Sequence, residues 1–241
     1  MLRAESICHN FGGLEVLRDV SIHIRAGEIV GLIGPNGAGK TTLFNALSGF
    51  LNPAHGSIFF EGGDVTGLAP HRLAERGLVR TFQGARVFPR FTVRESLRVA
   101  TDLPMRRNDA QAAALEGDVL ETFGLEEWAE VEARSLPGGM MRILGIAMAM
   151  SAGAKMLLLD EPAAGLNDVE VAELQEVIRR AHSRGVTICV IEHNLHFLMG
   201  LVQRALVLDA GMLIADGTPY EVTRNPSVIE AFLGGDDIAE G

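Results

Sequence analysis

The feature that most constrains the fold is a glycine-rich stretch, GLIGPNGAGKTTL (31–43), placed where a strand should give way to a helix. The run EIVGLIG (28–34) is almost wholly apolar, which suits a strand buried on both faces of a parallel sheet. The run KTTLFNALSGF (40–50) then has apolar side chains at helical spacing, and Gly49 can end the helix. This strand–loop–helix unit predicts an α/β fold.

The residue types of the loop indicate an anion-binding site, because GPNGAGKT (34–41) satisfies the pattern G-x-x-x-x-G-K-S/T. Glycines let consecutive backbone N–H groups point inward, and the helix that follows adds free N–H groups and the positive end of its dipole. We expect Lys40 to reach the β- and γ-phosphates of a nucleoside triphosphate, and the Thr41 hydroxyl to bind Mg²⁺. The predicted phosphate-binding residues are Gly34, Pro35, Asn36, Gly37, Ala38, Gly39, Lys40, Thr41 and Thr42.

An acidic motif completes the predicted chemistry. LLLDE (157–161) is typical of a buried strand that brings Asp160 to its end, where a carboxylate can hold Mg²⁺ directly or through water. Glu161, the next residue, can polarise the attacking water or accept its proton. The sequence therefore predicts hydrolysis as well as binding.

The remaining patterns predict how these motifs are organised within one domain over 1–241. Residues 93–150 are rich in Ala, Glu, Arg and Leu and mostly helical by pattern, so we expect an insertion into a core formed by 1–92 and 151–241. Strands that alternate with helices predict a mostly parallel central sheet with antiparallel hairpins at one side. The expected elements are strands over 155–162 and 186–193, a helix over 168–185, and hairpins over 56–65 and 204–217.

Composition excludes some classes of function. The net charge of −10 disfavours general binding of nucleic acid, because a phosphate backbone favours a basic face. Cys8 and Cys189 match no metal spacing, and we interpret them as free buried thiols in a reducing compartment. We expect no signal peptide, and the apolar run 143–150 is far shorter than the about 20 residues that span a bilayer. Any membrane span should therefore come from another chain.

Beyond these motifs the sequence resembles the ATP-binding cassette (ABC) ATPases over essentially its whole length. Gln83, in VRTFQ, looks like the family's glutamine-loop residue, which reaches Mg²⁺ and the attacking water and senses the membrane partner. His193, in VIEH, looks like the switch histidine that contacts the γ-phosphate, with His196 as the competing candidate. Phe11 sits where the family places an aromatic side chain on adenine, although core packing is the alternative.

The same resemblance implies the wider architecture. Residues 165–167 fall where the family has the loop that crosses a dimer after the catalytic glutamate, and 93–150 correspond to the helical subdomain. The implied fold is a P-loop NTPase with an antiparallel β-hairpin subdomain and an inserted helical subdomain. The implied substrate is ATP with Mg²⁺, bound between two cassettes that form a homodimer or a heterodimer.

One segment departs from the family pattern. The signature loop normally reads LSGGQ, whereas residues 136–140 read LPGGM. Pro137 offers neither a hydroxyl nor a backbone N–H to the partner's γ-phosphate, and Met140 lacks the amide of glutamine. Losing one charge-assisted hydrogen bond costs about 1.5–3 kcal/mol, so we expect slow basal hydrolysis. The loop residues that still suit nucleotide binding are Leu136, Gly138 and Gly139.

A finer resemblance concerns the subgroup. The segments EPAAGLN (161–167), LAPHRLAERGLVRTFQ (68–83), FTVRESL (91–97) and GTPYEVTRNPSVIEAFLG (217–234) are similar to ATPase subunits of branched-chain amino acid importers and of urea importers. Lipopolysaccharide-export ATPases are a further neighbour. The alternatives are therefore a urea importer, an exporter of that kind, or a weakly hydrolysing cassette that pairs with a competent one. A soluble cassette ATPase of DNA repair or translation fits less well, because this chain has one cassette and no heptads.

The resemblance also implies partners and location. Integral membrane permease subunits should dock near Gln83 and the helical subdomain, which would place the chain on the cytoplasmic face of the plasma membrane without crossing it. Within the segment GARVF (84–88), Val87 and Phe88 are the candidate contacts, with packing inside the domain as the alternative.

Overall fold

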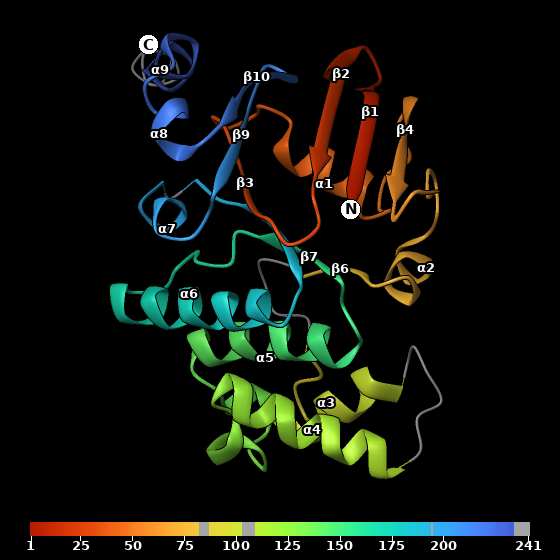
Figure 1. Cartoon of the computed structure of the whole chain (residues 1–241), viewed down its shortest axis with the longest axis vertical. Coiled ribbons are helices and arrows are strands. Elements are labelled where there is room, and N and C mark those ends of the chain that lie inside the picture. Colours follow the sequence, from red (N-terminus) through yellow and green to blue (C-terminus); the bar gives the residue numbers. More distant parts are fainter. Residues whose placement is uncertain (82–86, 103–108, 194, 234–241) are drawn as a thin grey trace.

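The computed structural model describes residues 1–81, 87–102, 109–193 and 195–233. Figure 1 shows a central sheet, a smaller sheet beside it and, below the central sheet, a group of helices. The helices are α1 (Lys40–Leu47), α2 (Pro70–Glu75), α3 (Val93–Asp102), α4 (Asp109–Phe123), α5 (Gly138–Ser151), α6 (Asp168–Ser183), α7 (Leu195–Met199), α8 (Pro219–Val222) and α9 (Pro226–Leu233). Two short 3₁₀ turns span Glu126–Trp128 and Ala133–Ser135.

Within the described residues the central sheet has six strands, of which five run parallel, and this agrees with the mostly parallel sheet that the sequence predicts. The antiparallel strand at its edge is the second strand of the predicted hairpin over 204–217. In spatial order the strands are β10 (Met212–Gly217), β9 (Arg204–Asp209), β3 (Ile29–Ile33), β8 (Thr187–Ile191), β7 (Met156–Asp160) and β6 (Leu78–Arg80).

Alternate side chains of the parallel strands enter two different cores, one on each face of the central sheet. On β7, Leu157 and Leu159 pack with α3–α6, whereas Met156 and Leu158 pack with α1 and the smaller sheet. Both faces of each central strand are therefore covered, which explains why these strands are continuous apolar runs in the sequence. Cys189 lies on the second face, and its complete burial raises the pKa of its thiol to about 12.

The smaller sheet is antiparallel and was only partly predicted. Its order is β2 (Leu14–Ile24), β1 (Leu2–Phe11), β4 (His55–Phe60) and β5 (Gly63–Asp64). The predicted hairpin over 56–65 forms β4 and β5, but it turns at 61–62 and not at Gly62-Gly63. The long β1–β2 hairpin was missed, because register shifts interrupt its pairing and blur the alternation of apolar side chains. Cys8, on β1, is half-buried rather than buried, and it is a free thiol like Cys189.

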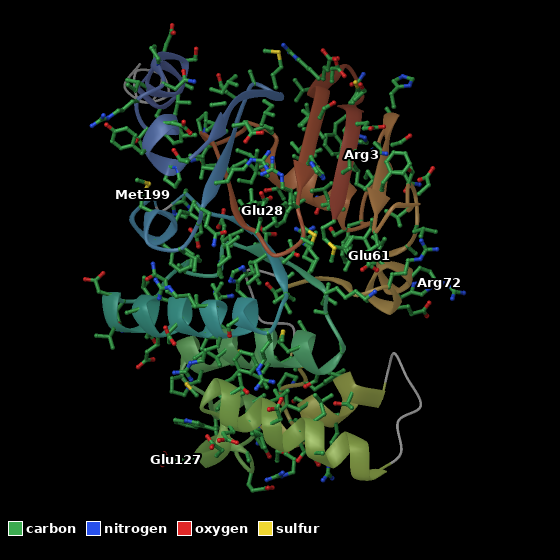
Figure 2. All side chains as sticks on the ribbon, in the orientation of Figure 1. Arg3, Glu28, Glu61, Arg72, Glu127 and Met199 are labelled. Atoms are coloured by element: carbon green, nitrogen blue, oxygen red, sulfur yellow. The ribbon has the colours of Figure 1, made fainter. Side chains whose placement is uncertain are left out.

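Helices α3, α4 and α5 form the layer below α6 in Figure 1. Ion pairs join this layer to the C-terminal end of α6, where Arg184 bonds Asp118 and Thr122 of α4. Charged side chains such as Arg72 and Glu127 lie at the outer edges of the molecule (Figure 2). In the described ranges, no helix has the length and apolar character needed to cross a membrane.

Candidate functional site

The phosphate loop has the backbone geometry that its glycines allow. Gly34 has a φ of 151°, and a Cβ on it would lie 2.0 Å from the carbonyl oxygen of Leu208. Gly39 has a φ of 100° and forms the N-cap of α1, where a Cβ would lie 2.9 Å from the oxygen of Val16. Side chains at these two positions would displace the backbone of β9 or β2.

Lys40 begins α1 and folds back over this loop. Its ammonium group donates hydrogen bonds to the carbonyl oxygens of Gly34 at 2.7 Å and Pro35 at 2.9 Å. Burial lowers the pKa of Lys40 below its ordinary value, and the nearby Glu161 carboxylate partly opposes this shift. The ammonium therefore lies on the loop beside free helix N–H groups, while Thr41 and Thr42 occupy the first turn of α1.

The two acidic residues of the site follow one another at the end of β7. Asp160 is the last residue of the strand and Glu161 leaves it with a φ of 44°, in the left-handed region that non-glycine residues seldom adopt. The N–H of Glu161 donates to the carbonyl oxygen of Ile191 at 3.0 Å, which fixes the bend against β8. Strained backbone of this kind clusters at functional sites.

His193 follows β8 in the same way that Glu161 follows β7. Its Nδ1 lies 4.0 Å from Oε1 of Glu161 and 4.0 Å from Oε2 of Glu192. The His193 side chain is 63% exposed, so a core role for it is excluded. The structure thus brings Lys40, Glu161 and His193 to the carboxyl ends of neighbouring parallel strands, where open α/β sheets bind ligands.

Three charged residues at this edge were missed from the sequence. Arg80, the last residue of β6, pairs with Asp160 at 2.6 Å. Glu192 is only 1% exposed and accepts a hydrogen bond from the N–H of Ala163 at 2.8 Å. Arg142, on α5, has its pKa lowered by burial, and the Glu192 carboxylate partly opposes this shift. The sequence could have indicated Arg80 and Glu192 by their positions, because each follows an apolar run that forms a strand.

The segment LPGGM lies at the start of α5, as predicted. Leu136 is buried, Pro137 is the N-cap of α5, and the helix begins at Gly138. Gly139 packs on the N-terminal turn of α6, since a Cβ there would lie 3.2 Å from the side chain of Glu170. Met140 packs against the core. The first turn of α5 has free N–H groups, as every helix N-terminus does, and such groups are suited to bind an anion.

The other predicted site residues differ in their placement. Phe11 ends β1 with 55% of its surface exposed and the His9 ring 4.7 Å away, so the core alternative for it is wrong. Gln83 lies outside the described residues. Val87 is half-buried and packs against the core, as the alternative for it proposed, whereas Phe88 is 46% exposed and stacks on Phe91.

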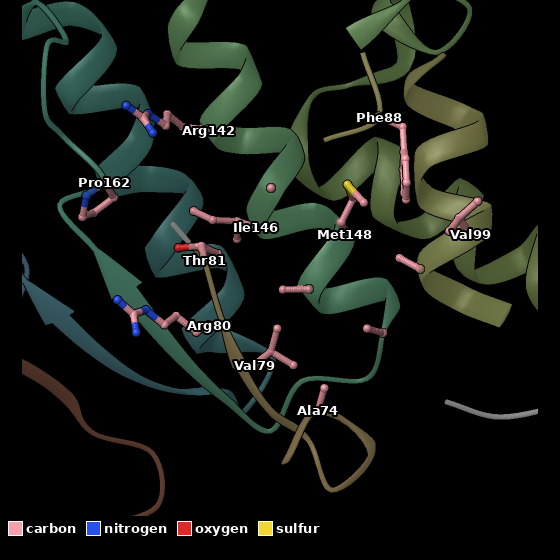
Figure 3. A pocket seen from close by; sticks show the side chains of 14 residues that line it. Ala74, Val79, Arg80, Thr81, Phe88, Val99, Arg142, Ile146, Met148 and Pro162 are labelled. Atoms are coloured by element: carbon pink, nitrogen blue, oxygen red, sulfur yellow. The ribbon is translucent and has the colours of Figure 1, made fainter. Parts of the chain in front are cut away.

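A mostly apolar hollow, which we call the groove, lies between β6 and the helices α3 and α5. Figure 3 shows Phe88 and Val99 on one side of it and Arg80, Arg142 and Pro162 on the other. The groove therefore lies next to the candidate site, since Arg80, which pairs with Asp160, also lines the groove. Its lining residues are Ala74, Val79, Arg80, Thr81, Phe88, Val99, Ala100, Arg142, Gly145, Ile146, Met148, Ala149, Ala152 and Pro162.

Comparison with known proteins assigns the family. The model of the family described as ABC transporter matches residues 17–164, more than half of the chain. The chain belongs to the ABC transporter family. A second model, described as branched-chain amino acid ATP-binding cassette transporter, matches residues 212–241. The resemblance stated above is therefore confirmed, and the chain is an ABC ATPase of the branched-chain amino acid subgroup.

Relatives and solved structures match the ABC ATPase over nearly its full length. The ATP-binding proteins of high-affinity branched-chain amino acid transport LivG of Salmonella typhimurium and BraF of Pseudomonas aeruginosa are 41% and 37% identical, each over 97% of this chain and 98% of theirs. LptB, a lipopolysaccharide export ATP-binding protein of Haemophilus influenzae, is 33% identical over 97% of each chain. The structure of the ADP conformation of MJ1267, an ATP-binding cassette of an ABC transporter, has a TM-score of 0.85 at 29% identity and covers 97% and 98% of the two chains. The predicted fold class is thereby confirmed.

Proposed function

We propose that this ABC ATPase energises a membrane importer of branched-chain amino acids. The observation that carries the ATPase chemistry is the Lys40 ammonium, bonded into the phosphate loop beside the Glu161 carboxylate. The match of residues 212–241 and the names of LivG and BraF support the cargo. The match to LptB, at lower identity, keeps an exporter as the second candidate.

The site residues act by position and charge rather than by covalent chemistry. Lys40 and the loop N–H groups neutralise the β- and γ-phosphates of ATP after the ammonium leaves the loop carbonyls. Glu161 orients the attacking water and accepts its proton, and His193 contacts the γ-phosphate. Phe11 stacks on adenine, and Gln83, which lies outside the described residues, is proposed to complete the site.

The donor chemistry at the strand end fits Mg²⁺. Thr41 and Asp160 offer a hydroxyl and a carboxylate, the hard oxygen ligands that Mg²⁺ favours beside substrate phosphates. Among the described residues no cluster of three or more His, Cys, Asp or Glu forms a dedicated metal cage, and an Mg²⁺ bound mainly through ATP needs none. The metal would supply charge for the phosphates, while Thr41, Gln83 and Asp160 hold it in place.

Two cassettes form the complete site, each placing its 136–140 segment against the ATP of the other. Leu136, Gly138 and Gly139 approach the γ-phosphate with the N-terminus of α5. ATP binds the closed pair better than the open pair, so binding closes the dimer and hydrolysis releases it. Residues 93–150 act as the helical subdomain that carries this segment, inserted in a core of 1–92 and 151–241.

Permease subunits dock in the groove and place the ABC ATPase on the cytoplasmic face of the membrane. Phe88, exposed at the edge of the groove, is the contact that the structure favours over Val87. The decisive experiment is reconstitution of the ATPase with its co-purifying membrane chains in vesicles. The proposal is supported if leucine, isoleucine or valine moves across the membrane toward the side that carries the ATPase, and only when ATP is supplied on that side. ATP-dependent export, or ATP-dependent uptake of urea, contradicts it.

A further inference from the structure

We propose that Arg80 is a positioning residue for the magnesium site: it holds the Asp160 carboxylate against α1 in the orientation that Mg-ATP requires. This inference rests on the metal role proposed above for Asp160. The Arg80 side chain is 5% exposed and that of Asp160 is 14% exposed, so water screens the pair little. One guanidinium nitrogen, Nη2, donates to Oδ2 of Asp160 at 2.6 Å.

The other end of the guanidinium is anchored on the helix that follows the phosphate loop. Nη1 of Arg80 donates to Oδ1 of Asn45 at 2.6 Å and to Oγ of Ser48 at 3.0 Å, and both residues belong to the last turns of α1 or its C-cap. The Phe44 and Phe50 rings lie 5.8 Å and 5.6 Å from the guanidinium carbon. Arg80 therefore bridges α1 and the end of β7, the two elements that carry Thr41 and Asp160.

The bridge has a geometric consequence for the metal. Because Oδ2 of Asp160 accepts from Arg80, the carboxylate cannot rotate freely, and Oδ1 becomes the oxygen available to the metal or its water. A planar guanidinium suits this task better than an ammonium, since two of its nitrogens reach two different elements. Arg80 itself touches no substrate atom in this account and acts only through Asp160.

The same side chain lines the groove, where Figure 3 shows Arg80 beside Thr81 and Val79. Arg80 is also three residues before Gln83 in the sequence. Arg80 thus lines the groove and also bonds the Asp160 carboxylate.

The test uses Arg80→Met, Arg80→Lys and Asn45→Ala, with Arg76→Met as the matched control, since Arg76 is an exposed arginine on the preceding turn. Thermal stabilisation by ATP is measured in EDTA and in magnesium, together with the free magnesium that gives half-maximal hydrolysis. In EDTA we expect ATP to stabilise all variants against thermal unfolding by as much as it stabilises the parent. In magnesium, Arg80→Met should need about tenfold more metal, because it loses a charge-assisted hydrogen bond. Arg80→Lys and Asn45→Ala should shift less, and Arg76→Met not at all.

The possible results distinguish a failure of the role proposed for Arg80 from a failure of the magnesium site on which that role depends. A parent protein whose hydrolysis needs no divalent metal would overturn the proposed magnesium site and this inference with it. A magnesium-dependent parent with an unchanged or lower requirement in Arg80→Met would overturn the inference alone. If Arg80→Met does not fold, Asn45→Ala decides, because it removes an anchor of Arg80 and leaves the Arg80–Asp160 pair present.

Discussion

The two nucleotide-binding surfaces proposed for the ABC ATPase differ in the number of charged and hydrogen-bonding side chains that they carry. On the phosphate-loop side, Lys40, Asp160 and Glu161 are all present, and buried contacts hold Lys40 and Asp160 in place. On the signature-loop side, residues 136–140 carry a proline and a methionine where the family has serine and glutamine. The first side relies on charged groups, whereas the second relies on the backbone N–H groups of a helix N-terminus.

This difference indicates where the energetic weakness of the two-chain site lies. Binding of ATP to one chain depends on the well-equipped side, so it should have ordinary strength. In the proposed two-cassette site, closure and hydrolysis also need the partner's 136–140 segment. A missing charge-assisted hydrogen bond there, worth about 1.5–3 kcal/mol, should weaken both by tenfold or more. Substitutions on the two sides should therefore have separable effects on binding and on turnover.

The largest effect is expected from Lys40→Ala. It removes the buried charge on the phosphate loop, so hydrolysis should be abolished and ATP binding weakened. Phosphate release and ATP binding measure the two effects. Lys155, the other lysine of the chain, is exposed and paired with Glu61, so Lys155→Ala is the control and should behave as the parent. Undiminished turnover in Lys40→Ala would remove the phosphate loop from its role.

Glu161→Gln should separate binding from hydrolysis on the same side of the site. Glutamine keeps the shape but cannot accept the proton of the attacking water, so ATP should bind and remain uncleaved. We expect the variant to accumulate as an ATP-bound dimer in size-exclusion chromatography. Glu173→Gln, on the exposed face of α6, is the control. A Glu161→Gln protein that hydrolyses ATP like the parent is incompatible with the proposed base.

Pro137→Ser addresses the signature-loop side. It restores a hydroxyl and a backbone N–H at the N-cap of α5, so basal hydrolysis should rise about tenfold. ATP binding to the isolated chain should not change, because the segment acts on the partner's nucleotide. Pro219→Ser, at the start of α8, is the control for a proline-to-serine change. Unchanged turnover and unchanged ATP-driven dimerisation in Pro137→Ser would mean that the departure from the family pattern has no energetic weight.

The smallest effect on the isolated protein is expected from Phe88→Ser. Phe88 lines the groove and lies outside the nucleotide site, so hydrolysis without permease should stay at the parental rate. Transport in reconstituted vesicles should fall sharply, because a docked permease could no longer bury the Phe88 ring. Ile229→Ser, an exposed apolar residue on α9, serves as the comparison. Normal transport in Phe88→Ser would dismiss the groove contact.

The sequence predicted those parts of the site whose chemistry is local along the chain. The phosphate loop and LLLDE each combine an apolar strand with the polar residues that end it, and a parallel sheet brings such ends to one edge. The pair of Arg80 and Asp160 joins residues 80 positions apart, and nothing in either segment specifies the other. The left-handed backbone of Glu161 was equally hidden, because it depends on the bond to Ile191 of β8.

The fold shows the same division. Strands buried on both faces were predicted because they are uninterrupted apolar runs, as in 28–34 and 155–162. The β1–β2 hairpin was missed, since its outer face is exposed and its register shifts at several positions. Val87 illustrates why contact predictions from residue type alone are weak, because its apolar side chain packs inward while the neighbouring Phe88 faces the groove.

The most direct measurement is calorimetric titration of the folded parent protein with Mg-ATP, in parallel with Lys40→Ala and Pro137→Ser. Heat of association that is equal in the parent and Pro137→Ser, and lost or strongly reduced in Lys40→Ala, is the predicted result. A folded parent that releases no heat of association, and that nucleotide does not stabilise against unfolding, would contradict the claim that this chain binds ATP through its own phosphate loop.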